Sequence, residues 1–125
     1  MTTPEIEEFA KILVQHVRDA AIQSNDRALR EENVLAKRWR KAAASCSPEA
    51  FAKVLIPDIV DDTLFYLLHA IDDGLLKLSF TASNGKAVDL STEGLSELAG
   101  WYVGSDAWRA KYAKERFVDD FSDLK

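Results

Sequence analysis

The chain has 125 residues, of which 47% are hydrophobic, and its formal net charge is −5 at pH 7. This length and apolar content suit one domain with one core, which we expect to cover residues 1–125. The acidic balance disfavours nucleic-acid binding, which depends on clustered Lys and Arg side chains. No apolar run approaches the roughly 20 residues of a membrane span. With a single cysteine, Cys46, and no signal-like N-terminus, the sequence predicts a cytoplasmic protein.

The N-terminal third is expected to form two helices that pack as an antiparallel pair. Thr3 is a typical N-cap, and Pro4 suits the first helical position. Apolar residues at spacings of three and four then predict one buried stripe, formed by Ile6, Phe9, Leu13, Val17 and Ala20. The polar side chains of residues 24–26 compete for backbone hydrogen bonds, so a break there is favoured over one continuous helix. The second helix would cover residues 26–44.

Two more helices are expected between residues 48 and 73. Ser47 is the predicted cap of the first, which begins at Pro48 and covers residues 48–56. Pro57 lacks a backbone N–H and is therefore expected to end it. A new helix is expected over residues 58–73, with Gly74 as its C-terminal stop.

A β-hairpin is expected next, packed against the helices because an isolated hairpin is marginal in water. Apolar and polar residues alternate over residues 76–81, and a second short strand follows the Asn-Gly turn. A two-residue loop would mix core and solvent faces. A three-residue loop at residues 83–85, with Gly85 left-handed, instead pairs Phe80 with Val88.

The last two helices are expected over about residues 91–103 and 107–117, separated by Gly104 and a cap at residues 105–106. The fold class is therefore mainly α: five to six helices in one compact domain, with a small antiparallel hairpin at about residues 75–90. Four aromatic residues are expected to fill the C-terminal part of the core: Trp101, Trp108, Tyr112 and Phe117. The functional alternative is a ligand pocket lined by these rings, with Arg109 and Asp106 as its nearby polar groups.

The strongest pattern is a local excess of acid. Residues 57–106 carry nine carboxylates against only Lys77 and Lys86. On a helical wheel, residues 58–73 divide into two faces. The expected core face carries Ile59, Val60, Leu64, Leu67, Leu68 and Ile71. The opposite face carries Asp58, Asp61, Asp62, Phe65, Tyr66, His69, Asp72 and Asp73.

This second face could be a solvated surface only, but two rings among carboxylates also suit docking to a basic partner. We therefore expect a non-enzymatic protein-binding or regulatory module without a cofactor, in which carboxylates steer a basic protein and Phe65 and Tyr66 anchor it. In composition the chain resembles bacterial inhibitor and immunity proteins that neutralise a basic toxin. That resemblance implies the same kind of partner.

Two alternatives stay open. One is a metal-dependent hydrolase that uses helical carboxylates and an imidazole, with ligands Asp58, Asp62, His69 and Asp73 and a further acid from Glu31 or Glu32. The other is an oligomeric structural protein, such as a homodimer joined through the N-terminal helices. The basic residues 37–41 surround Trp39, which we expect in the core with solvated cations around it. These cations could instead pair with the acidic helix of a second copy.

Overall fold

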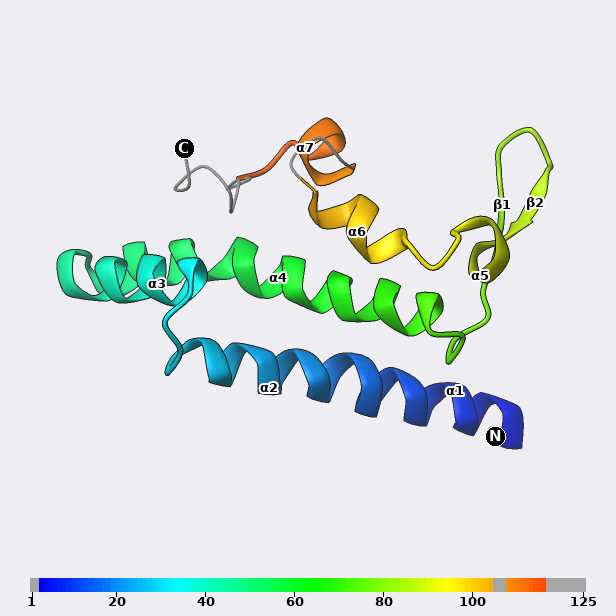
Figure 1. The fold of residues 1–125 in the computed structure, drawn as a ribbon, viewed down its shortest axis with the longest axis horizontal. Coiled ribbons are helices and arrows are strands. Elements are labelled where there is room, and N and C mark those ends of the chain that lie inside the picture. The colour runs from blue at the N-terminus through cyan, green and yellow to red at the C-terminus, as the bar shows by residue number, and fades with distance from the viewer. Residues whose placement is uncertain (1–2, 105–107, 117–125) are drawn as a thin grey trace.

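The computed structural model describes residues 3–104 and 108–116, and most of them are helical (Figure 1). The predicted mainly α fold with one antiparallel hairpin is confirmed. In chain order the elements are α1 (Pro4–Ile12), η1 (Leu13–Arg18, a π-helical stretch), α2 (Asp19–Ala28), α3 (Val34–Ser45), α4 (Pro48–Asp72), β1 (Ser79–Thr81), β2 (Ala87–Asp89), α5 (Leu90–Glu93), α6 (Leu98–Val103) and α7 (Trp108–Tyr112). Within the described residues, none of the helices combines the length and the apolar character needed to cross a membrane.

Two of the predicted helix starts, those capped by Thr3 and Ser47, are confirmed. The Oγ1 of Thr3 accepts a hydrogen bond from the N–H of Ile6 at 3.2 Å, and the Oγ of Ser47 accepts one from Ala50 at 3.2 Å. A proline follows each cap at the first helical position. The predicted stop of α4 is also confirmed, because Gly74 has a φ of +78°, which favours glycine.

The predicted break at residues 24–26 is wrong. The chain stays helical from α1 through η1 and α2, which together form one rod. Asn25 does not break this rod because its Nδ2 donates to the carbonyl of Ala21 at 2.7 Å, within the same helix. The chain turns only after Ala28, and Asn33 then caps α3 by accepting from the N–H of Ala36 at 2.8 Å.

Helix α4 runs through the middle of the fold and is one helix rather than two (Figure 1). Pro57 lies inside it, so the prediction that this residue ends a helix is wrong. Proline costs a helical hydrogen bond, but α4 is held along its length by η1, α2, α3 and α6. Those tertiary contacts outweigh the local preference.

The buried core lies where the C-terminal half of α4 meets η1 and α6. Its main cluster consists of Val17, Ala70, Ile71, Leu76 and Leu98. The rod and α3 each pack on α4, whereas the sequence predicts that they pack on each other. Of the predicted N-terminal stripe only Val17 is buried, and α1 contains no buried residue.

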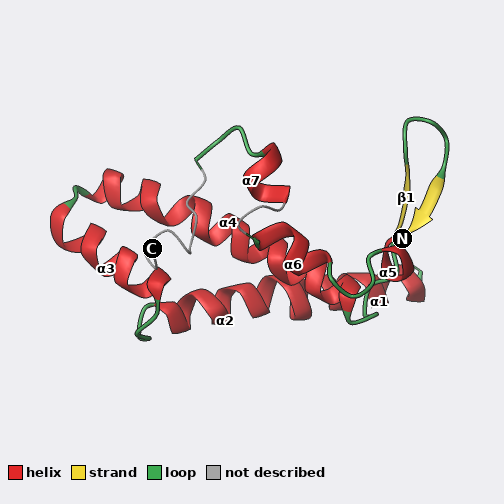
Figure 2. Ribbon diagram, turned by 45° about the horizontal axis from the view of Figure 1, so that its top comes forward, coloured by secondary structure: helices red, strands yellow, loops and turns green. Residues whose placement is uncertain are grey.

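The predicted register of the hairpin is confirmed. Phe80 pairs with Val88, and Gly85 in the loop has a φ of +86°. The hairpin does not lie against the helices, however. It projects from the body in both views (Figures 1 and 2), and Phe80 is exposed.

The predicted helix over residues 91–103 is wrong, because the chain forms two short helices there. Leu95 and Ser96 lie between α5 and α6 with φ values of 53° and 59°, outside the helical region. Gly104 ends α6 as predicted. Helix α7 ends at Tyr112, earlier than expected, and the predicted cap at residues 105–106 lies outside the described residues.

Candidate binding cleft and the open face of α4

Asp58 has partners inside the molecule. It is 8% exposed, and it accepts hydrogen bonds from Arg38 Nη2 at 3.0 Å, Arg38 Nε at 3.3 Å and Trp39 Nε1 at 2.7 Å. An ionised carboxylate with charge-assisted bonds of this kind is a strong local link. Asp58 therefore ties α3 to α4 and is not available at the surface for a partner.

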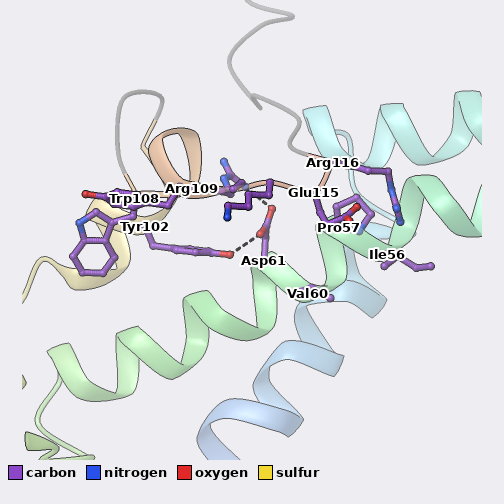
Figure 3. Close-up of a pocket in the computed structure, with 12 residues that line it drawn as sticks. Ile56, Pro57, Val60, Asp61, Tyr102, Trp108, Arg109, Glu115 and Arg116 are labelled. Carbon is purple, nitrogen blue, oxygen red and sulfur yellow. Dashed lines mark hydrogen bonds and ion pairs between the residues drawn. The ribbon is translucent and has the colours of Figure 1, made fainter. Parts of the chain in front are cut away.

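Asp61 joins α4 to the C-terminal helices. Its Oδ1 accepts from the Tyr102 hydroxyl at 2.7 Å, and its Oδ2 accepts from Arg109 Nη1 at 2.8 Å (Figure 3). Arg109 is buried and also donates from Nη2 to the carbonyl of Val103 at 3.2 Å. Burial, and then the hydrogen bond to Asp61, raise the pKa of Tyr102, so this hydroxyl stays protonated and donates near neutral pH.

Asp72 caps another helix. Its Oδ1 and Oδ2 accept from the backbone N–H groups of Leu98 and Ala99 at 2.9 and 3.0 Å. A carboxylate in the last turn of its own helix is disfavoured by the macrodipole, but it is favoured at the N-terminus of a neighbouring helix. The contact to α6 explains why an acid occupies this position.

The other members of the predicted docking face divide between core and surface. Tyr66 packs against the main core cluster. Asp62 is half-buried, and burial raises its pKa, an effect that a hydrogen bond to Ser24 opposes. Three residues stay together nearer the surface: Phe65, His69 and Asp73. The ring of Phe65 stacks on that of His69 at 5.8 Å, and His69 Nε2 lies 3.2 Å from Asp73 Oδ2.

The residues of the metal hypothesis are not gathered into a ligand set. Across residues 3–104 and 108–116, no group of three or more His, Cys, Asp or Glu side chains is placed to hold a metal ion. Asp58 is bound to α3, and the proposed acids from the neighbouring helix face arginines instead. Glu31 lies 4.0 Å from Arg27, and Glu32 lies 3.1 Å from Arg40.

The aliphatic side of α4 is more exposed than the wheel predicts. Leu67 and Leu68 are partly buried and Ile71 is buried, as expected. In the middle of the helix, however, four aliphatic side chains are between 37% and 51% exposed, and we call them the open face: Ile56, Ile59, Val60 and Leu64. The wheel separates the two faces, but the partners of Asp58 and Asp61 come from α3, α6 and α7. These elements therefore cover the acidic side of α4 and leave its aliphatic side open.

A cleft of about 970 Å³ lies between α4 and the C-terminal helices, next to the open face (Figure 3). Ile56 and Val60 contribute to it from α4, and Trp108 and Tyr112 contribute from α7. On the other side of α4, a smaller hollow of about 270 Å³ includes Ile59 and residues of η1 and α2. The open face is thus the ridge between two apolar hollows.

Two polar groups of the cleft, Asp61 and Tyr102, are already held in hydrogen bonds within the molecule. Both oxygens of Asp61 already accept hydrogen bonds, and Tyr102 keeps its proton, so neither is poised as a general base. The predicted aromatic pocket corresponds to this cleft in part, since Trp108, Tyr112 and Arg109 line it. Trp101 packs on Trp108 at 5.9 Å instead of lining the cleft. Phe117 and Asp106, also named in that prediction, lie outside the described residues.

Sequence reasoning missed Ile56 and Val60 as site residues. Val60 has the spacing of a core position, and no local signal distinguishes a buried aliphatic row from an open one. Comparison with known proteins adds no assignment, because the chain matches no family model, no curated protein and no solved structure. A functional proposal must therefore rest on the chemistry of the site.

Proposed function

We propose that this protein is a non-enzymatic binding module whose open face and adjoining cleft receive an apolar element of a partner protein. One observation carries the proposal. The central helix turns carboxylates inward to fixed partners and leaves four aliphatic side chains about half exposed. Contiguous apolar surface of this kind marks interaction sites in soluble proteins.

Burial of the open face would make a measurable contribution to the affinity for a partner. Completing the burial of each half-exposed aliphatic side chain is worth about 1 kcal/mol. Four such side chains would therefore contribute about 4 kcal/mol, or nearly three powers of ten in affinity. Tyr112, which is 73% exposed at the cleft, adds an aromatic side chain of the type that often dominates interfaces.

The shape of the surface favours a protein segment over a compact small molecule. The cleft on one side of α4 and the hollow on the other share the ridge formed by Ile59 and Val60. A surface that is long, apolar and open fits the mode in which one face of an amphipathic helix is laid into a groove. The partner would bury the ridge and fill the flanking hollows.

A basic partner remains our proposal for the long-range encounter, with its basic side chains meeting the acidic surface outside the cleft. It is supported by the net charge of −5, which attracts cationic surfaces over several ångströms in a salt-dependent way. Phe65, His69 and Asp73 are the part of the predicted docking face that stays together nearer the surface. Charge would thus speed the encounter, and the open face would supply the affinity.

A capture experiment with two matched variants tests the proposal. Val60 and Ile6 are both 51% exposed and both lie on helices, but only Val60 belongs to the open face. Wild type, Val60→Asp and Ile6→Asp would be used as bait in extract of the cells that make the protein, after circular dichroism has shown equal helicity. We expect Val60→Asp alone to lose the captured partner. Equal capture by all three proteins would refute the role of the open face.

A further inference from the structure

The rim of the cleft has a charge opposite to that of the protein. Asp61 and Arg109 neutralise each other at 2.8 Å inside the cleft. Among the described residues, the other charged side chains that line it are Lys114, Glu115 and Arg116, which leave one net positive charge. In a chain of net charge −5, this is a local site for a segment that is both apolar and acidic.

The chain itself contains such a segment directly after the rim. Residues 117–125 lie outside the described part of the structure, but their sequence is known. It includes four apolar residues, Phe117, Val118, Phe121 and Leu124, and three carboxylates, Asp119, Asp120 and Asp123, against one cation, Lys125.

We propose that residues 117–125 are a ligand of the cleft within the same chain, and that they compete with the partner for it. The apolar residues of this segment match Ile56, Val60 and Tyr112, and its carboxylates match the cations of the rim. Because the segment begins next to Arg116, no long connection has to be closed. This proposal rests on the proposed function, since it concerns regulation of the same site.

Tethering makes weak contacts effective. A segment joined directly to its site has an effective concentration in the millimolar range or above. An intrinsic Kd of about 0.1 mM would then leave only about one cleft in ten open at 1 mM effective concentration. The apparent affinity for the partner would fall by the same factor, until the partner displaces the segment.

A synthetic peptide tests this competition directly. The probe is a fluorescein-labelled peptide with the sequence of residues 117–125, followed by anisotropy. It would be titrated with the full-length wild type and with the full-length variant Phe117→Ser/Phe121→Ser/Leu124→Ser. We expect the triple variant to bind the peptide at least fivefold more tightly than wild type does. Adding Val60→Asp should abolish that binding, and raising the salt from 50 to 500 mM should weaken it.

Two results would overturn the proposal: equal affinity of the peptide for wild type and the triple variant, or no binding of the peptide by the triple variant. Neither result would refute the proposed function if Val60→Asp still lost the captured partner. The opposite outcome is also possible: Val60→Asp could abolish binding of the peptide and leave capture of the partner unchanged. That outcome would refute the proposed partner site but support the intramolecular contact. A peptide in which Phe121 is replaced by Asp is the matched negative control.

Discussion

Replacing Asp58 by alanine should destabilise the protein far more than replacing any exposed carboxylate of α4. Asp58 is the acceptor for both Arg38 and Trp39, and its side chain is only 6% exposed. In the variant Asp58→Ala, a mostly buried guanidinium loses this anion and an indole N–H loses its acceptor. Neither group can recover full hydration without separating α3 from α4.

The cost can be worked out from these contacts. Removing one partner of a buried ion pair costs about 3–5 kcal/mol. Because Arg38 keeps 16% of its side-chain exposure, the lower end of this range applies. The lost acceptor for Trp39 adds about 1 kcal/mol, which gives a total near 4 kcal/mol. For a domain whose stability lies between about 5 and 15 kcal/mol, that is a large fraction.

Urea unfolding followed by circular dichroism measures this cost. With a slope of about 1.5 kcal/mol per molar urea, the midpoint of Asp58→Ala should fall by more than 2 M. The matched control is Asp73→Ala on the same helix, whose contact with His69 is half exposed; an exposed contact of this kind is worth less than about 1 kcal/mol. If Asp58→Ala lost no more stability than Asp73→Ala, the buried position of Asp58 would be wrong. The result would then favour the sequence-based prediction that Asp58 lies on a solvent-facing acidic surface.

Three further predictions follow from single side chains. Asp72→Ala should cost about 1–2 kcal/mol in urea unfolding, because α6 loses its N-terminal cap; an unchanged midpoint would contradict this. Gly94→Ala should destabilise the fold, because an added Cβ would lie 2.6 Å from the carbonyl oxygen of Leu90. Gly100→Ala places its Cβ in open space within a helix and should raise the free energy of unfolding by about 0.5–1 kcal/mol. A higher thermal midpoint for Gly94→Ala than for Gly100→Ala would contradict the packing of α5 and α6. Burial raises the pKa of Asp62, so its charged form opposes folding, and stability is lost as the pH rises through the ordinary range of an aspartate near 4. Asp62→Asn should therefore raise the urea midpoint at pH 7 and lose this advantage below pH 4, and a lower midpoint at pH 7 would refute it.

The features that the sequence predicts correctly are those decided within a few residues. Thr3 and Ser47 cap helices through hydrogen bonds that reach only three residues along the chain. The hairpin register follows from the local alternation of residues and from the need for a left-handed Gly85. In each case the residue that indicates the structure and the backbone groups that it bonds or positions lie in the same short segment.

The features that it misses depend on partners far along the chain. Asp58 is bound by residues 19 and 20 positions away, and Asp61 by residues 41 and 48 positions away. A helical wheel divides α4 into an acidic and an aliphatic face. It does not predict that Arg38 and Arg109 will bind the carboxylates and bury the acidic face. The open face, and with it the candidate site, therefore becomes visible only when the packing of α3, α6 and α7 is known.

The central claim is that the open face of α4 is where another protein binds, and site-specific photo-crosslinking tests it most directly. A benzophenone side chain at position 60 would be compared, in the cells that make the protein, with the same group at position 6, which has an equal exposed fraction. We predict a discrete covalent adduct with another protein from position 60 and none from position 6. No adduct from position 60, or the same adducts from both positions, would contradict the account.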